Sequence, residues 1–319
     1  MKTIDGRVLW VVGAGGLLGR ALVAEAALAG SVVRRSTVPW HDPAAAAVTL
    51  ARDARTVLSS YRDVSLFWCA GPGVVATQPE ALNQELKLFT NFLEALAEIH
   101  QEHLASVLRL YLASSAGGVY AGSDGAPFTE TTQPCAISPY GEQKIAAEAA
   151  VRAFAARTGF SALIGRMSNL YGPGQDLAKP QGLITQLCRA QLQRAPLLIY
   201  VSLDTARDYL YVRDAARMVL AGMVRLAERP HGTVVVKIFA SRVSTTLAAI
   251  VGEIRRVTKR RSPIVMGASP SAQFQVRDLR FRSVNWTDLD SFASTPLPAG
   301  IACTLESVAA SIFASRLGR

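Results

Sequence analysis

A glycine-rich turn near the N-terminus constrains the fold of this chain more than any other feature. Gly13, Gly16 and Gly19 recur at intervals of three, after the apolar run RVLWVV and before an alanine-rich stretch of helical character. Where a strand passes into a helix through such a turn, free backbone N–H groups and the positive end of the helix dipole favour a phosphate. We therefore predict a pyrophosphate-binding loop: Gly13 forms the tight turn, Gly16 lets the backbone approach the ligand, and Gly19 lets the helix pack closely.

Strands and helices alternate along most of the chain. Further apolar runs with the length of buried strands are SVVRR (31–35), VSLFWCAG (64–71), VLRLYLASS (107–115) and FSALIGR (160–166). Helices are expected at about residues 16–29, 79–102, 138–158 and 214–228. A shorter unit is expected around AVTL (47–50), between the strands at 31–35 and 64–71. The alternation predicts an α/β fold, a doubly wound parallel sheet of the Rossmann type with helices on both faces.

The regular alternation stops after Arg166, where the sequence NLYGPGQDLAKPQG is rich in loop-forming residues. A later helix and the strand TVVVKIFA are expected to return to the sheet. We predict a dinucleotide-binding Rossmann domain over residues 1–170, with its sheet completed by about 212–240. A smaller mixed α/β C-terminal cap is expected from residues 171–211 and 241–319. Because no low-complexity linker separates the two parts, they should pack against each other.

The composition narrows the class of protein. Half of the 319 residues are hydrophobic, which allows a sizeable core. No run reaches the roughly 18 apolar residues of a membrane span, and the start MKTIDGRVLW lacks the apolar core of a signal peptide. Four cysteines far apart fit no metal-ligand spacing, so we interpret them as free thiols in a reducing compartment. They are Cys69, Cys135, Cys188 and Cys303. These features predict a cytoplasmic protein that contacts no membrane.

The net charge of +10 raises the question of a nucleic-acid partner. Arginine supplies most of the 34 basic residues, but these are scattered and only 7% of the chain is aromatic. The densest cluster, RRVTKRRS (255–262), follows an amphipathic stretch and is interpreted as its solvated end. A nucleic-acid partner is therefore not expected. His100 and His103, three residues apart near a helix end, are interpreted as solvated side chains, and we expect no metal site.

The end of the second strand bears on the choice of dinucleotide. A carboxylate there would bind the adenosine ribose hydroxyls and indicate NAD. The sequence instead has Arg34 and Arg35, with no carboxylate before Asp42. Adjacent arginines can pair with a 2′-phosphate, so we favour NADP; two solvent-facing arginines, with NAD as the cofactor, are the alternative. The cofactor-binding residues expected from the two segments are Gly13, Gly15, Gly16, Leu17, Leu18, Gly19, Arg34 and Arg35.

The segment SPYGEQK carries the predicted chemistry. Tyr140 and Lys144 lie four residues apart, on one face of the expected helix. A lysine ammonium one turn away, together with the positive charge of a nicotinamide, favours the phenolate and makes the tyrosine an acid–base group at neutral pH. The lysine can also bind the nicotinamide ribose. Such a pair on an arbitrary helix is usually structural, but here it follows the glycine loop and the serine-bearing strand end LASSAGGVY.

Taken together, these motifs resemble the extended short-chain dehydrogenase/reductases. The resemblance rests on the glycine loop, Ser114 and Ser115, Tyr140 and Lys144, and the segments RMSNLYGPG and RDYLYV, and it runs to about Ala240. Within that family the chain is most similar to the nucleotide-sugar epimerases, dehydratases and ketoreductases. The resemblance implies a Rossmann domain with a cap that binds a nucleoside-diphosphate sugar. It also implies a homodimer formed through the two long helices.

By position, the resemblance implies roles for individual residues. Tyr140 would be the acid/base, and Lys144 its partner. Asn169, in RMSNLYGP, and Arg207, in RDYLYV, would contact the phosphates of the substrate. The segment VRDLRFRS would supply a further phosphate-binding arginine, with Arg280 taken as the candidate from among Arg277, Arg280 and Arg282.

One departure from the family concerns the strand end before the tyrosine. Epimerases of this group typically read Ser-Ser-Ser-Ala-Thr-Val-Tyr-Gly, whereas this chain reads SSAGGVYA over residues 114–121. The third serine, which hydrogen-bonds the reacting hydroxyl in the family, is Ala116, and the threonine is Gly118. Ser115 is the nearest hydroxyl that could replace the serine, with Ser114 behind it. Two glycines stand where the 4,6-dehydratases have an Asp-Glu pair, which disfavours a dehydratase mechanism.

Three functions remain open. The favoured one is reduction of a ketone on a nucleotide-activated sugar with NADPH, because of the two arginines. The second is epimerisation, in which a ring carbinol is oxidised and the hydride returns to the other face, with the cofactor retained. The third is a non-catalytic dinucleotide-binding protein, which Ala116 and Gly118 support and the Tyr-Lys pair disfavours. Under either enzyme hypothesis, the candidate catalytic residues are Tyr140, Lys144, Ser115 and Ser114.

Overall fold

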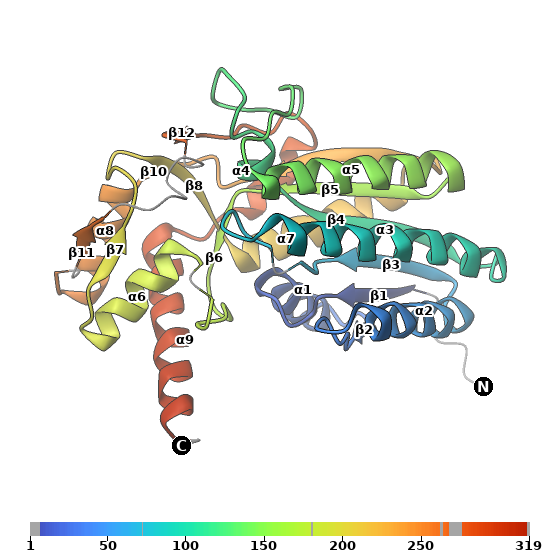
Figure 1. Ribbon diagram of the computed structural model, residues 1–319, viewed down its shortest axis with the longest axis horizontal. Coiled ribbons are helices and arrows are strands. Elements are labelled where there is room, and N and C mark those ends of the chain that lie inside the picture. The colour runs from blue at the N-terminus through green and yellow to red at the C-terminus, as the bar shows by residue number, and fades with distance from the viewer. Residues whose placement is uncertain (1–6, 72, 180, 262–263, 268–275, 318–319) are drawn as a thin grey trace.

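The larger part of the protein is a parallel sheet. The computed structural model describes residues 7–71, 73–179, 181–261, 264–267 and 276–317 (Figure 1). Six parallel strands follow the order β2-β1-β3-β4-β5-β9. They are β1 (Arg7–Val12), β2 (Val33–Ser36), β3 (Asp63–Trp68), β4 (Val107–Ser115), β5 (Ser161–Met167) and β9 (Val234–Phe239). This Rossmann-type arrangement confirms the α/β fold expected from the alternation of strands and helices.

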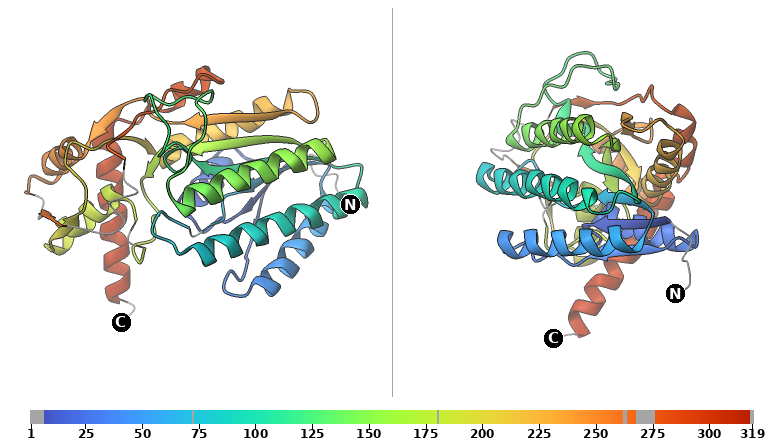
Figure 2. Two further views of the ribbon diagram at one scale, coloured as in Figure 1. Left: turned by 45° about the horizontal axis from the view of Figure 1, so that its top comes forward. Right: turned by 90° about the vertical axis from the view of Figure 1, so that its right-hand side faces the viewer.

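Helices cover both faces of the sheet. One face carries α2, α3 and α5 and the other carries α1 and α7, as the end-on view in Figure 2 shows. Their bounds are α1 (Leu17–Leu28), α2 (Pro43–Ser60), α3 (Pro79–Gln101), α5 (Pro139–Thr158) and α7 (Val212–Ala227). Under α3, the rings of Trp68 and Phe92 stack with their centres 5.2 Å apart, and Trp10 meets Phe92 edge-on. These buried layers fix the carboxyl ends of β1, β3 and β4, which is where such sheets bind ligands.

The unit expected around AVTL is longer than predicted, because residues 47–50 lie inside the 18-residue helix α2. The helix begins after Asp42, whose Oδ1 accepts hydrogen bonds from the N–H groups of Ala44 and Ala45. A side-chain cap followed by Pro43 and a run of alanines starts a helix directly. The chain therefore passes from β2 through one helix to β3. Within the described residues, β2 is an edge strand of the sheet.

A smaller cap of short strands and helices lies beside the sheet (Figure 1). Its strands are β6 (Asn169–Tyr171), β7 (Leu197–Ile199), β8 (Ala206–Tyr211), β10 (Ser244–Thr246), β11 (Ile264–Met266) and β12 (Asp278–Leu279). The remaining helices are α4 (Ala116–Val119), α6 (Leu183–Gln193), α8 (Leu247–Thr258), the 3-10 helix η2 (Thr287–Phe292) and α9 (Leu297–Leu317). Between the cap segments, α7 and β9 return to complete the parallel sheet. The domain limits proposed from the sequence stay a prediction.

The C-terminal helix α9 bears on the expectation of no membrane contact. Over Leu297–Ser315 it is long and apolar enough to meet the criteria for a membrane span, and 22% of that stretch is buried. Ile301 and Val308 belong to the core that α9 shares with α6 and α8. Core helices of soluble proteins pass the same test, so the feature is weak evidence for a membrane. The expectation that the protein contacts none stays a prediction.

Candidate functional site

The turn between β1 and α1 is built for close backbone approach. Gly13 has a φ of +88°, and a Cβ atom there would lie 2.5 Å from the backbone nitrogen of Ala70. A Cβ atom at Gly19 would overlap the carbonyl oxygen of Gly13, so the helix packs directly on the turn. Among the described residues, nothing lies within 4 Å of the Cβ position of Gly15, and the nearest atom to that of Gly16 is 3.4 Å away. The turn needs glycine on its protein side and presents bare backbone on its other side.

The helix α1 begins at this turn without a side-chain cap. Gly16 is its N-cap residue, and its first turn contains no acidic side chain. Leu18 is buried and Leu17 is half-buried in the core formed with β1 and α7. These two predicted cofactor residues therefore anchor the helix through their side chains and offer a ligand only their backbone. An uncapped helix N-terminus beside bare glycine backbone fits the pyrophosphate of a dinucleotide.

Sequence reasoning missed Arg20, which lies at the same turn. Its Nε donates a hydrogen bond to the carbonyl oxygen of Gly15 at 2.7 Å, and its side chain is exposed. Its Cδ atom lies 3.6 Å from the Cβ position of Gly174, in the loop after β6. This position places a cation beside the proposed pyrophosphate site. A basic residue directly after the third glycine was the signal that could have found it.

The two arginines of β2 lie in different surroundings. The Nε of Arg34 donates a hydrogen bond to the Tyr61 hydroxyl at 3.0 Å, and its guanidinium lies 5.7 Å from the centre of that ring. Tyr61 follows the last residue of α2, just before β3 begins. The hydrogen bond to Tyr61 therefore directs the Arg34 side chain toward the amino-terminal end of β3, whereas the glycine turn lies at the carboxyl ends of the strands. Arg35 is exposed and precedes Ser36, which pairs with Val12 where β1 enters the turn. Of the two, Arg35 is the better placed for a cofactor phosphate.

Tyr140 and Lys144 lie on the first turns of α5. The helix starts where the sequence indicates: the Oγ of Ser138 accepts a hydrogen bond from the N–H of Gly141 at 3.2 Å, and Pro139 occupies the first helical position. The Lys144 ammonium lies 5.3 Å from the centre of the Tyr140 ring. Lys144 is buried and Tyr140 is half-buried. The structure therefore brings the predicted pair together, with a largely buried cation beside the phenol ring.

A carboxylate from α3 joins this pair, and sequence reasoning missed it. The Oε1 of Glu85 lies 3.5 Å from the Nζ of Lys144 and accepts a hydrogen bond from the Nε2 of Gln143 at 3.0 Å. Its Oε2 accepts the backbone N–H of Gly73 at 3.3 Å. Because Glu85 and Lys144 are 59 residues apart in the chain, no local pattern points to this contact. The Oε1 of Gln143 is buried without a hydrogen-bond partner among the described residues.

Ser114 is engaged in a buried network. Its hydroxyl donates a hydrogen bond to Oε1 of Glu148 at 2.7 Å. The same carboxylate forms an ion pair with Arg166, whose Nη2 lies 2.6 Å from Oε2, and Nη1 of Arg166 donates to the Tyr120 hydroxyl. These contacts join β4, β5 and α5 beneath the Tyr-Lys pair. Ser114 therefore has a structural partner for its only proton, which disfavours it as the hydroxyl that contacts a substrate.

Ser115 is placed differently. It is half-buried, and its Oγ accepts the N–H of Gly118 at 3.1 Å as the N-cap of α4. This contact uses an oxygen lone pair and leaves the hydroxyl hydrogen to donate elsewhere. Gly118 also touches the acid–base candidate: a Cβ atom there would lie 3.1 Å from Cε1 of Tyr140. The glycine that replaces the threonine of the family is thus where α4 packs on α5.

The three residues expected to bind the substrate phosphates lie in or directly after the strands of one small sheet of the cap. Strand β8 pairs with β6, β10 and β12. Arg207 on β8 is 6% exposed, and burial lowers the pKa of its guanidinium because removal from water penalises the charge. Asn169 on β6 is exposed and donates a hydrogen bond to the Asp208 carbonyl oxygen at 3.0 Å. Arg280 is exposed after β12 and pairs with Asp278, at 2.7 Å between Nη2 and Oδ2. Of the three, only Arg207 is buried.

The other candidates lie apart from this arrangement. Arg277 forms an ion pair with Asp204 at the surface. The four cysteines are free thiols. We expected His100 to be solvated, but it contacts other residues. Its Nε2 lies 2.6 Å from the Ser106 carbonyl oxygen, and its ring meets Phe160 edge-on. Within the described ranges, no group of three or more His, Cys, Asp or Glu side chains is placed to hold a metal ion.

Comparison with known protein families decides the class. The model of the family described as "NAD dependent epimerase/dehydratase family" matches residues 9–236. This chain belongs to that family. The resemblance to extended short-chain dehydrogenase/reductases that act on nucleotide sugars is thereby confirmed.

Curated relatives match part of the chain. The protein named "Uncharacterized UDP-glucose epimerase YtcB" of Bacillus subtilis (strain 168) is 26% identical over 169 residues, which are 53% of this chain and 50% of that protein. The dTDP-4-dehydro-6-deoxyglucose reductase of Escherichia coli is 30% identical over 115 residues, 36% of each chain. The chain thus spans half or less of the length of these relatives. Their names give different activities, so they do not select one for this chain.

Solved structures match nearly the whole chain. MoeE5 in complex with UDP-glucuronic acid and NAD is 27% identical, with a TM-score of 0.76 over 96% of this chain and 100% of that one. The UDP-glucose 4-epimerase of Thermotoga maritima, solved with UDP-glucose, is 21% identical, with a TM-score of 0.80 over 96% of this chain and 99% of that one. The second likeness shows the fold, cap included.

Proposed function

We propose that this protein is a nicotinamide-dinucleotide-dependent enzyme that transfers a hydride at a ring carbon of a nucleoside-diphosphate sugar, with Tyr140 as its acid/base. The observation that carries the proposal is the Lys144 ammonium 5.3 Å from the centre of the Tyr140 ring at the start of α5. A protein that only binds a dinucleotide needs the glycine turn but not this pair. The sugar-nucleotide class is supported by MoeE5, which was solved with UDP-glucuronic acid and NAD.

In the proposed reaction each predicted residue has a separate task. The glycine turn would hold a nicotinamide dinucleotide, which would supply the hydride acceptor. The Tyr140 phenolate takes the proton of the sugar hydroxyl while the hydride leaves the same carbon, so the alcohol loses two electrons and becomes a ketone. Lys144 stabilises the phenolate, and Ser115 donates a hydrogen bond to the sugar oxygen. The buried Arg207 binds the diphosphate, because a phosphate offsets the penalty of burying its charge.

For the cofactor we propose NAD, and for the reaction epimerisation with the cofactor retained. Because Arg34 is hydrogen-bonded to Tyr61, only Arg35 of the two arginines remains as a candidate for binding a 2′-phosphate. The NAD found in solved relatives such as MoeE5 supports the same choice. NADPH-dependent ketoreduction is the second candidate, and the exposed Arg35 near the end of β2 is the observation that favours it. A homodimer through α3 and α5 and a cytoplasmic location belong to the same proposal.

Native mass spectrometry of the purified protein and NMR of its reaction products test the proposal. Native spectra show whether a dinucleotide is retained, and incubation with UDP- and dTDP-hexoses, followed by NMR, identifies any product. An epimer formed without added cofactor is the expected result. Product formed only from a keto sugar with NADPH would select the second candidate. A retained dinucleotide without turnover of any sugar nucleotide would instead favour a binding protein.

The variant Tyr140→Phe tests the role of the tyrosine. It keeps the ring and removes the hydroxyl, so we expect turnover to fall by about 10² to 10⁴ with cofactor affinity nearly unchanged. Tyr61→Phe is the matched control, because it removes a hydroxyl at the opposite edge of the sheet, and it should retain full activity with NAD. A fully active Tyr140→Phe protein would refute the acid/base assignment.

A further inference from the structure

We propose that Glu85 is the counter-charge of the catalytic lysine, a positioning residue that holds Lys144 and limits how strongly its ammonium favours the Tyr140 phenolate. The inference rests on the proposed function and deepens it. Its basis is the contact between α3 and α5, where Oε1 of Glu85 lies 3.5 Å from the Nζ of Lys144. Neither side chain has ready access to water, since their exposed fractions are 14% and 10%.

The Glu85 carboxylate fixes three neighbours at once. Besides Lys144, it accepts hydrogen bonds from Nε2 of Gln143 at 3.0 Å and from the N–H of Gly73 at 3.3 Å. Its Oε2 lies 3.2 Å from the Cβ position of Gly73, and Cδ2 of Tyr140 lies 3.7 Å from the same position. The Glu85 carboxylate and the Tyr140 ring therefore both lie next to Gly73, in the loop after β3. Removing the charge of Glu85 should therefore change the electrostatic potential at the Tyr140 phenol.

Among the described residues, the other charges near this cluster are exposed or paired: Glu142 on α5 and Lys87 on α3 are exposed. Glu148, one turn beyond Lys144 on α5, is neutralised by its ion pair with Arg166. At the end of β3, burial raises the pKa of the Cys69 thiol, so this group stays neutral. The described ends of β4 and α4 contribute hydroxyls and backbone but no ionisable side chain. An ammonium shared with a carboxylate favours a phenolate less than an unshared one, so Glu85 sets the pH range in which Tyr140 accepts a proton.

The test is the pH dependence of the first hydride transfer, measured in single turnovers of the enzyme with its nicotinamide cofactor and saturating substrate. Glu85→Gln keeps the size and hydrogen bonding of the side chain but removes its charge. The pH of half-maximal rate on the acid limb should fall by roughly one to two units, the effect of one charge about 6–12 Å away at an effective dielectric constant of about 20. Glu94→Gln is the matched control on the same helix, because Glu94 pairs with Arg157 of α5 at 2.7 Å but is 59% exposed.

The Glu94→Gln protein should keep the acid limb of the unaltered enzyme. An acid limb that does not move in Glu85→Gln would overturn the inference, since a purely structural role changes rate and stability without moving the limb. If Glu85→Gln does not fold, Glu85→Asp and Glu85→Asn make the same comparison at equal length, with and without the charge. An unaltered protein that transfers no hydride from any sugar nucleotide would refute the proposed function. An active one with an unmoved limb would refute only the role of Glu85.

Discussion

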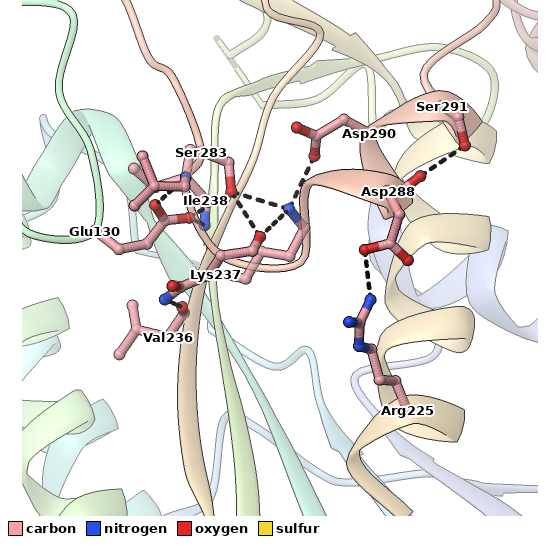
Figure 3. Close-up of polar contacts among 11 residues, drawn as sticks. Glu130, Arg225, Val236, Lys237, Ile238, Ser283, Asp288, Asp290 and Ser291 are labelled. Atoms are coloured by element: carbon pink, nitrogen blue, oxygen red, sulfur yellow. Dashed lines mark hydrogen bonds and ion pairs between the residues drawn. The ribbon is translucent and has the colours of Figure 1, made fainter. Parts of the chain in front are cut away.

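Removing the buried ammonium of Lys237 should destabilise the protein more than any surface change nearby. Lys237 on β9 is 0% exposed, and its Nζ donates to Oδ1 of Asp290 at 2.8 Å and to Oγ of Ser283 and the carbonyl oxygen of Asn285, each at 2.9 Å (Figure 3). All three ammonium hydrogens are therefore used. Ser283 in turn donates to Oε1 of Glu130 at 2.6 Å. The network fastens η2 and the segment before it to the parallel sheet.

The magnitude follows from what each substitution leaves behind. Lys237→Met leaves the Asp290 carboxylate buried without its cation, which typically costs about 3–5 kcal/mol. With about 2–4 °C lost per kcal/mol in a chain of this size class, the unfolding midpoint should fall by roughly 6–20 °C. The double variant Lys237→Met/Asp290→Leu removes both charges, so it should recover much of that loss.

Thermal and urea unfolding of the two variants measure these differences. The matched control is Arg225→Met, because Arg225 pairs with Asp288 of the same 3-10 helix, and the Asp288 side chain is 65% exposed (Figure 3). An exposed pair contributes little, so this variant should unfold close to the unaltered protein. The reasoning is refuted if Lys237→Met is no less stable than Arg225→Met, or if the double variant is as unstable as the single one.

Two further predictions concern cofactor binding. Gly13→Ala should abolish retention of the dinucleotide and lower stability by more than Gly30→Ala. Gly30 also has a positive φ, of +72°, but in the described part of the chain nothing lies within 4 Å of its Cβ position. The Gly30 variant should cost only the backbone strain of about 1–2 kcal/mol, and unfolding with NADH titration compares the two; equal losses would contradict the close packing at Gly13. Arg35→Ala should remove any preference for NADPH over NADH, whereas Arg34→Ala should not, since Tyr61 holds its guanidinium. Competitive titration measures the preference, and equal effects of the two variants would contradict the assignment.

Local sequence patterns predicted those features that are determined by interactions between residues close together in the sequence. The glycine spacing located a turn in which Gly13 and Gly19 have no room for a side chain. Ser138 and Pro139 marked the start of α5, and the structure begins that helix at Pro139. The alternation of apolar and helical stretches was enough to predict the parallel sheet. In each case the deciding interaction lies within a few residues of the pattern that signals it.

Contacts between distant segments could not be predicted in the same way. Glu85 meets Lys144 across 59 residues, and Glu130 meets Ser283 across 153. A glutamate on an amphipathic helix has the same local sequence signal whether it faces water or a buried ammonium. The strands of the cap are also short, only two residues long in β12, which is too few to show a periodicity. The arrangement of the substrate side of the site therefore comes from the structure alone.

The missing serine and threonine of the family leave a coherent site rather than a defective one. Gly118 stands between the two hydroxyls that remain: its N–H donates to Oγ of Ser115, and its Cα hydrogens face the Tyr140 ring. A side chain at this position would press on the ring, as the 3.1 Å between its Cβ position and Cε1 of Tyr140 shows. The glycine therefore lets α4 and α5 pack closely, so that Ser115 and Tyr140 both lie next to Gly118. Because that N–H uses only one lone pair of the Ser115 oxygen, the hydroxyl hydrogen can donate to a substrate oxygen. The catalytic hypothesis thus needs no third serine, and Ala116, fully buried, becomes a packing residue of α4.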